Sequence, residues 1–177
     1  MLALVMYSCN PYEQYSCTHY YIQVELDPGS AQFSANVQMV YLTGKPYTDS
    51  ICFYLNRDVE IHTLAAQELQ HYRFERGDTG LLILYIEDPV SANEQLHISL
   101  SYSGRINKQE VLHLDSSHFW YPVNEDTPPS TFQAKFALPG EWQISHPPAS
   151  TGKHGKRLIE TRKPQNSLNI IFTRDQP

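Results

Sequence analysis

Apolar and polar residues alternate with a period of two along most of this chain, which is the pattern of strands that bury one face. The clearest example is the stretch from residue 95 to 104, where Leu96, Ile98, Leu100 and Tyr102 share one face. A histidine and three serines occupy the positions between and after them. The pattern predicts a strand with one face against a core and the other in water.

The stretch that precedes this strand, residues 81–86, is apolar at every position. Apolar residues on both faces are typical of a strand in the middle of a packed layer. Residues 88–93 lie between the two stretches and contain Asp-Pro and Ser-Ala-Asn, which form turns and end strands. We therefore expect residues 81–86 and 95–104 to form a central antiparallel pair.

The same alternation recurs at short intervals through the rest of the chain. Residues 20–26 and 33–41 flank the turn sequence Asp27-Pro28-Gly29-Ser30, which predicts a hairpin. Further strands are expected at residues 51–55, 72–74, 132–136, 142–144, 158–161 and 168–172. Roughly ten short strands at this spacing predict an all-β fold, an antiparallel two-layer β-sandwich.

Residues 59–69 fit two patterns. Ile61, Leu64, Ala65 and Leu69 follow a helical stripe, and the segment is rich in good helix formers. The flanking strands favour an extended conformation instead. A strand from Val59 to Leu64 is the preferred interpretation.

The organisation along the chain predicts an irregular N-terminal arm at residues 1–17 and a single β-sandwich domain at residues 18–177. A chain of 177 residues can enclose one sizeable core, and it contains no internal repeat or low-complexity linker. The apolar run from Met1 to Met6 is too short for a signal-peptide core or a membrane span. We expect a soluble protein, and the sequence does not specify its compartment.

Charge and cysteine content exclude some classes of function. The net charge of −6 argues against a nucleic-acid-binding surface, which needs a basic stripe. Cys9, Cys17 and Cys52 are odd in number, and their spacing fits neither a zinc knuckle nor a redox Cys-x-x-Cys. We expect small, buried or partly buried thiols.

No catalytic signature is present. The chain contains no His-Glu-x-x-His, no Gly-x-Ser-x-Gly and no phosphate-binding loop that ends in Lys-Ser or Lys-Thr. His113, Asp115 and His118 are the best candidate for a metal site, because two imidazoles and a carboxylate within six residues can converge if the loop folds back. The alternative, a polar surface loop that carries histidines, is preferred.

An aromatic cluster at residues 118–122 is the best candidate for a binding face. Trp120 and Tyr121 would serve as rigid anchors, and Glu125 and Asp126 as hydrogen-bond acceptors. The alternative is structural: the aromatic side chains of this segment, Trp120 among them, close one end of the sandwich.

Several strands match, in order, the motifs of a known family. His19–Leu26 resembles the family's opening strand, and Phe33–Val37 resembles its Phe-x-Gly-x-Val strand, with Ala35 in the place of glycine. Residues 51–55 followed by 59–61 resemble the next pair of strands.

Later segments continue the match. Ser101–Ile106 is similar to the family's Tyr-x-Gly-x-Ile ending, and Trp120-Tyr121-Pro122, with Phe132 and Phe136–Pro139 after it, resembles a Phe-Pro segment late in the same domain. Over residues 19–172 the chain thus resembles the N-terminal β-domain of the M1 family of zinc aminopeptidases, the group that includes leukotriene A4 hydrolase.

The resemblance implies a saddle-like β-sandwich that packs on a thermolysin-like catalytic domain and helps to wall its substrate cleft. In the family the zinc ligands, the general base and the transition-state tyrosine belong to that catalytic domain. The expected function is therefore that of a non-catalytic module without a cofactor of its own, whose partner is a catalytic domain or another protein. No substrate-binding residue is carried over, because the family's Asp-Ala-Arg pattern is replaced by Ser116, Ser117 and His118.

Two other functions remain as alternatives. One is a free-standing module that binds a peptide or carbohydrate through Trp120 and Tyr121, which requires exposed, coplanar rings. The other is a small metal enzyme built on His113 and His118.

Overall fold

A computed structural model describes residues 17–44, 48–67, 69–106, 113–124, 129–151, 156–161 and 163–174. The chain is almost entirely extended over these ranges, which confirms the predicted all-β class. Its strands are β1 (His19–Asp27), β2 (Gln32–Leu42), β3 (Thr48–Leu55), β4 (Glu60–Ala66), β5 (Leu69–Arg76), β6 (Gly80–Val90), β7 (Gln95–Arg105), β8 (His113–Leu114), β9 (Thr131–Ala137), β10 (Trp142–His146), β11 (Ser150–Thr151), β12 (Arg157–Glu160) and β13 (Ile170–Arg174). A 3₁₀ turn, η1 (Ser116–His118), follows β8.

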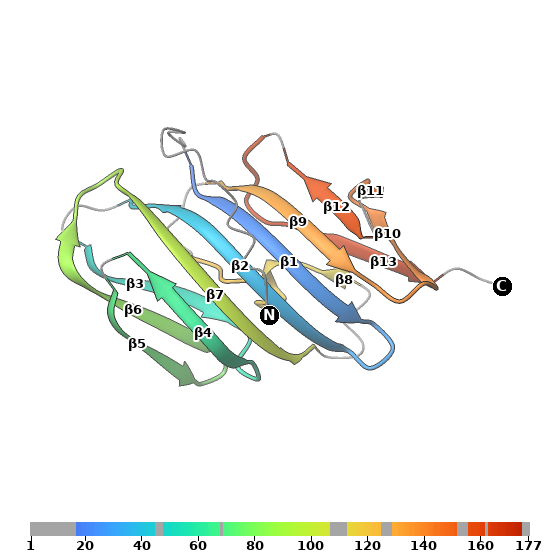
Figure 1. The fold of residues 1–177 in the computed structure, drawn as a ribbon, viewed down its shortest axis with the longest axis horizontal. Coiled ribbons are helices and arrows are strands. Elements are labelled where there is room, and N and C mark those ends of the chain that lie inside the picture. Colours follow the sequence, from blue (N-terminus) through green and yellow to red (C-terminus); the bar gives the residue numbers. More distant parts are fainter. Residues whose placement is uncertain are drawn as a thin grey trace, which may run out of the picture.

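The strands form two layers. One layer is a seven-stranded sheet in the order β11-β12-β9-β1-β2-β7-β4. Two three-stranded sheets, β3-β6-β5 and β10-β13-β8, make up the other. Figure 1 shows β3-β6-β5 behind the β4 end of the large sheet and β10-β13-β8 behind its β12 end. Ring contacts join the layers at both ends, between Tyr41 and Phe53 at 5.5 Å and between Phe136 and Phe172 at 5.8 Å.

Alternation along the strands of the large sheet places its apolar side chains inward, as predicted. The buried set includes Tyr20, Ile22, Val24, Leu26, Phe33, Ala35, Val37, Met39, Leu96, Ile98, Leu100, Tyr102, Phe132, Ala134 and Phe136. These residues belong to one hydrophobic cluster with the inner faces of the small sheets. The opposite face of the large sheet carries polar side chains, among them Gln23, Asn36, Gln38 and Ser99.

The predicted hairpin is confirmed, with β1 and β2 antiparallel and Leu26 opposite Phe33. The expectation of a wholly antiparallel structure needs one correction, because β1 also pairs in parallel with β9, with Ile22 beside Ala134. A parallel pair requires a long crossover. Here the connection between the two strands contains β2 to β8 and so includes strands of both layers.

The predicted central pair of residues 81–86 with residues 95–104 is wrong. Both segments are strands, but β6 lies between β3 and β5, whereas β7 lies between β2 and β4 in the other layer. The chain crosses between the layers over residues 91–94. Thr43 fixes this crossing, since its backbone N–H donates to the Glu94 carbonyl at 3.0 Å and its hydroxyl donates to the Ser91 carbonyl.

The preferred interpretation, a strand from Val59 to Leu64 in place of a helix, is confirmed, because β4 covers residues 60–66. Ile61 lies opposite Tyr102 and Leu64 lies opposite Leu100, so both face the core. The register shifts between Ile61 and Thr63, which makes His62 the extra residue of a β-bulge. The bulge, not a helix, produces the spacing of three between these apolar residues.

Of the predicted N-terminal arm only Cys17 falls among the described residues, and its side chain is buried. The assignment of residues 18–177 to a single domain stays a prediction. Within the described ranges no helix is long and apolar enough to cross a membrane.

Candidate functional site

The segment from His113 to Asn124 joins the two small sheets. At its start, β8 forms the edge of one small sheet by pairing with β13. At its end, Val123 and the β3 residue Tyr54 exchange backbone hydrogen bonds of 2.7 and 2.9 Å. The Asn56 N–H also donates to the Phe119 carbonyl at 2.8 Å. We call residues 113–124 the joining segment, because they connect the edges of both small sheets.

Trp120 and Tyr121 lie in the middle of the joining segment and point into the core. Their exposed fractions are 0% and 2%. The Tyr102 hydroxyl donates to the Trp120 carbonyl at 2.8 Å. The Tyr121 ring contacts Tyr20 and Phe132 of the large sheet at centroid distances of 5.7 and 5.6 Å.

The predicted aromatic platform is therefore wrong. The two rings are buried, and their planes meet at 70° instead of lying coplanar. A ligand cannot stack on rings that the large sheet already covers. Glu125 and Asp126, the predicted acceptors, lie outside the described residues. The structural alternative is what the geometry shows: Trp120 and Tyr121 fill the interior where the small sheets meet.

Burial also governs the chemistry of the tyrosines around the joining segment. It raises the pKa of Tyr121 to about 12, partly offset by the hydrogen bond that its hydroxyl oxygen accepts from the Leu168 N–H at 3.3 Å. Burial likewise raises the pKa of Tyr20 and of Tyr102 well above the ordinary value. These hydroxyls stay protonated at neutral pH and act as structural hydrogen-bonding groups, not as bases.

His113, Asp115 and His118 do not assemble a metal site. Asp115 caps η1: its carboxylate accepts from the Ser117 N–H at 2.8 Å, and its own N–H donates to His118 Nδ1 at 3.1 Å. Partial burial tends to raise the pKa of Asp115, but the hydrogen bonds from Ser117 and the nearby His118 bring this pKa below its ordinary value. His113 is exposed on β8, and its electrostatic interaction with Asp115 also lowers the pKa of that carboxyl group.

The described residues contain no group of three His, Cys, Asp or Glu side chains that could hold a metal ion.

A different surface stands out once the sheets are placed, the outside of the sheet β3-β6-β5. Alternate residues of β6 point inward, and Leu81, Ile83 and Tyr85 lie on the outer side of the sheet, where Ile83 is nevertheless only 8% exposed. The outward neighbours on β3 and β5 are fixed by register: Cys52, Tyr54, His71, Arg73 and Glu75. We call these eight residues the β6 outer face.

The β6 outer face is aromatic and apolar at its centre. The His71 ring stacks on Tyr85 at 4.3 Å and 12°, and Phe119 lies 5.6 Å from Tyr54. Phe119 adopts a positive φ of 49°, a conformation that a bulky side chain rarely takes. Hydrogen bonds from the Asn56 N–H to its carbonyl and from its own N–H to the Ser116 carbonyl hold it there.

The sequence contained a signal for this surface, because residues 81–86 are apolar on both faces. We interpreted the pattern as a strand covered on both sides. In this two-layer sandwich the second apolar stripe lies on the outer side of its sheet, where Ile83 is buried and Leu81 and Tyr85 are half-buried.

These features define the class of the protein as a mixed-topology β-sandwich with one large polar face and one partly apolar face. No protein-family model matches the chain. No curated protein sequence matches it either.

Solved structures of one family share the fold. The M1 zinc metallopeptidase from Deinococcus radiodurans matches with a TM-score of 0.66 and 16% identity, over 88% of this chain and 41% of that one. A mutant two-domain M1 zinc metallopeptidase bound to L-arginine matches with a TM-score of 0.65 and 16% identity, over 90% and 43%. A mutant of the Deinococcus radiodurans enzyme bound to a Tyr-Ser-Ala substrate matches with a TM-score of 0.64 and 17% identity, over 89% and 42%.

At this identity the match concerns the fold, and it confirms the resemblance that the order of strands predicts. The chain spans less than half the length of the metallopeptidases that it matches.

Proposed function

We propose that this chain is a non-catalytic β-sandwich module that packs on the catalytic domain of an M1-type zinc metallopeptidase and helps to shape its substrate cleft. Two findings support this role. The fold match covers 88% of this chain but 41% of the metallopeptidase, so a large part of such an enzyme has no counterpart here. The sequence also lacks the His-Glu-x-x-His pattern with which zinc peptidases bind their metal.

The observation that carries the proposal is the contrast between the two outer surfaces of the sandwich. The large sheet turns glutamine, asparagine and serine side chains outward. The β6 outer face instead presents Leu81, Tyr85 and Tyr54, each half-buried, around Ile83, which is itself only 8% exposed. Contiguous apolar patches on a soluble domain mark surfaces that another protein covers.

The energetics of covering this patch are favourable. Full burial of a large apolar side chain contributes about 1.5–3 kcal/mol. Leu81, Tyr85 and Tyr54 are already half-buried in the isolated chain, so a partner that covers them adds only the remaining part of this free energy. Their sum is on the order of 3 kcal/mol, enough to hold domains that a linker or a further interface keeps together.

The test begins with the coding sequence around this chain, which is expected to encode a domain with His-Glu-x-x-His in the same polypeptide or in an adjacent gene. That domain is produced separately, and its affinity for the chain is measured by calorimetry. Leu81→Lys is expected to weaken binding at least tenfold, about 1.4 kcal/mol. The new lysine lies beside Glu75, which favours retention of the fold.

Gln23→Lys is the matched control, because it adds the same charge on the outer face of the large sheet and is expected to leave binding unchanged. Equal binding by both variants would contradict the β6 outer face as the docking surface. The chain alone, supplied with zinc and amino-acid amides, is expected to show no turnover. Zinc-dependent hydrolysis by the chain alone, lost on His118→Ala, would overturn the non-catalytic assignment.

A further inference from the structure

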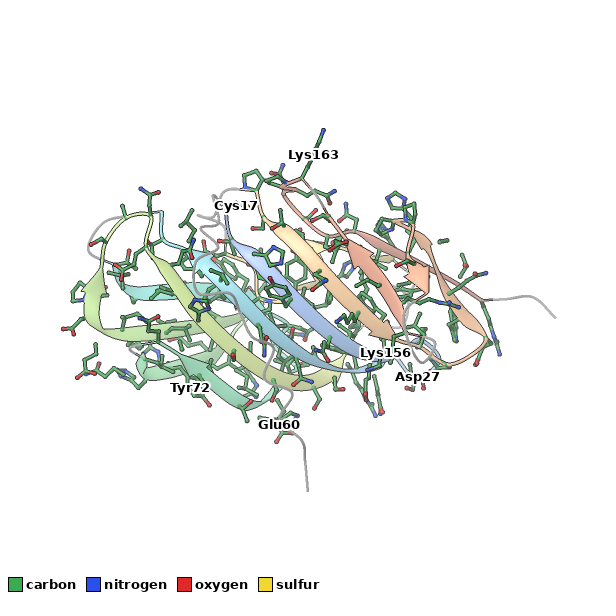
Figure 2. The ribbon with its side chains drawn as sticks, turned by 45° about the horizontal axis from the view of Figure 1, so that its top comes forward. Cys17, Asp27, Glu60, Tyr72, Lys156 and Lys163 are labelled. Carbon is green, nitrogen blue, oxygen red and sulfur yellow. The ribbon has the colours of Figure 1, made fainter. Side chains whose placement is uncertain are left out.

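On one side of the sandwich each layer ends in an edge strand, β4 in one layer and β5 in the other. Each is paired on one side only among the described strands, β4 with β7 and β5 with β6. Tyr72 shows the exposure of the β5 edge most clearly. It lies opposite the fully buried Leu84 and so points toward the core side of its sheet, yet it is 44% exposed. Figure 2 shows Tyr72 at this margin of the molecule.

The two faces of β5 differ in character. Tyr72 and Phe74 lie opposite Leu84 and Leu82 and continue the apolar inner face of the sheet. Arg73 and Glu75 lie on the outer face, where they form an ion pair of 2.7 Å between largely solvent-exposed side chains. A strand added beside β5 must therefore be apolar on one face and charged on the other.

The sequence of β5 meets that requirement when it is paired with itself. In an antiparallel pair related by a two-fold axis at Phe74, each Arg73 lies opposite Glu75 of the second copy. The two Phe74 side chains lie opposite each other, and each Tyr72 lies opposite Arg76. No other register places Arg73 opposite Glu75, because in an antiparallel pair the two residue numbers have a constant sum.

Charged residues on an edge strand usually prevent edge-to-edge pairing. This protection works when residues of like charge lie opposite each other across the pair. A two-fold axis at Arg73, for example, would place the two Arg73 side chains opposite each other. Opposite charges two residues apart have the reverse effect in an antiparallel pair, since both cross-strand contacts become attractive.

We propose that this chain forms a two-fold symmetric dimer through β5, which joins two three-stranded sheets into the six-stranded sheet β3-β6-β5-β5-β6-β3. The occupant of the open edge is a second copy of the chain. The edge is small compared with a standard interface, so the dimer is expected to dissociate with a constant on the order of micromolar. This proposal does not depend on the docking of a catalytic domain.

The test is sedimentation velocity of the purified chain between ~1 and ~500 μM. Arg73→Glu and Glu75→Arg each place like charges opposite one another and are expected to weaken the dimer about tenfold. The double variant Arg73→Glu/Glu75→Arg restores opposite charges and is expected to return the dimer to within about threefold of the wild type. Glu87→Arg, an exposed charge reversal on β6, is the control and leaves the dimer unchanged.

A wild-type chain that stays monomeric over the whole range would overturn the proposal. So would single variants that dimerise normally, or a double variant that is no stronger than the singles. Circular dichroism of each variant verifies the fold, and the exposure of both side chains favours its retention. Raising the salt concentration weakens the wild-type dimer if the ion pairs hold it, and has no such effect on a purely apolar contact.

Discussion

The hydrogen bond from Tyr102 to the joining segment offers a direct test of how the two layers are held together. Tyr102 is 1% exposed on β7, and its hydroxyl donates to the Trp120 carbonyl at 2.8 Å. Tyr102→Phe keeps the ring and removes only the donor. The lost bond costs about 1 kcal/mol, and the buried carbonyl left without this donor adds about 1–3 kcal/mol. We expect the free energy of unfolding to fall by about 2–4 kcal/mol.

The assay is urea denaturation at pH 7, followed by far-UV circular dichroism and by tryptophan fluorescence. The midpoint should fall while the slope with urea stays constant, because the same surface is exposed on unfolding. Tyr72→Phe removes a hydroxyl from a side chain that is 44% exposed, and it should change stability by less than about 0.5 kcal/mol. A loss below about 0.5 kcal/mol in Tyr102→Phe would refute the role of this bond.

The remaining predictions concern titration, close packing and the buried indole. Because burial raises the pKa of Tyr20, Tyr102 and Tyr121 above 10, the folded chain holds protons that the unfolded chain releases at high pH. These tyrosines should therefore leave the stability measured by urea denaturation unchanged between about pH 7 and pH 10 and lower it above pH 10, by up to about 1.4 kcal/mol per pH unit for each tyrosine. A flat profile from about pH 10 to pH 11 would contradict this. Gly80→Ala would place a Cβ 2.5 Å from the Leu55 carbonyl oxygen and 2.6 Å from the Phe74 ring, so it should lower the free energy of unfolding by about 1–3 kcal/mol. The Cβ of Gly140→Ala would meet nothing within 4 Å, so this control should lower it far less. Equal effects of the two variants would show that close packing at Gly80 does not matter. Trp120 Nε1 is buried with no hydrogen-bond partner among the described atoms, so the indole ring stabilises the fold by packing alone. In urea denaturation followed by circular dichroism, Trp120→Phe should therefore lower the free energy of unfolding by less than about 1.5 kcal/mol, and Trp120→Ala by about 3–5 kcal/mol. Similar losses in the two variants would contradict a role in packing alone.

The fold class could be predicted from the sequence because alternation is a local property. The strand at residues 95–104 appears as expected, and the turn after Leu26 closes the predicted hairpin. The partners of a strand are not local. Residues 81–86 and 95–104 are neighbours in sequence, but the contacts of Thr43 with Ser91 and Glu94 direct the chain into the other layer.

The candidate site was harder to predict, for the same reason. Trp120 and Tyr121 are residue types that are common in binding faces. Only the packing of Tyr20 and Phe132 against Tyr121 shows that this aromatic pair lies in the interior. The outer stripe on β6 was visible in the sequence as a run of apolar residues. Whether such a run lies in a core or at a surface depends on how many layers of the fold cover it, which the sequence does not show. The bulge at His62 changed the apolar spacing of β4, and no local rule separates that spacing from a helix.

The most direct test of the docking surface uses Cys52, an exposed cysteine at the centre of the β6 outer face, opposite Ile83. The measurement is the rate at which iodoacetamide alkylates Cys52, with and without a saturating amount of the proposed catalytic-domain partner. Cys52→Ser identifies the modified site. We expect the alkylation rate of Cys52 to fall at least tenfold in the complex. A complex that forms while Cys52 reacts at its original rate would show that the catalytic domain docks elsewhere.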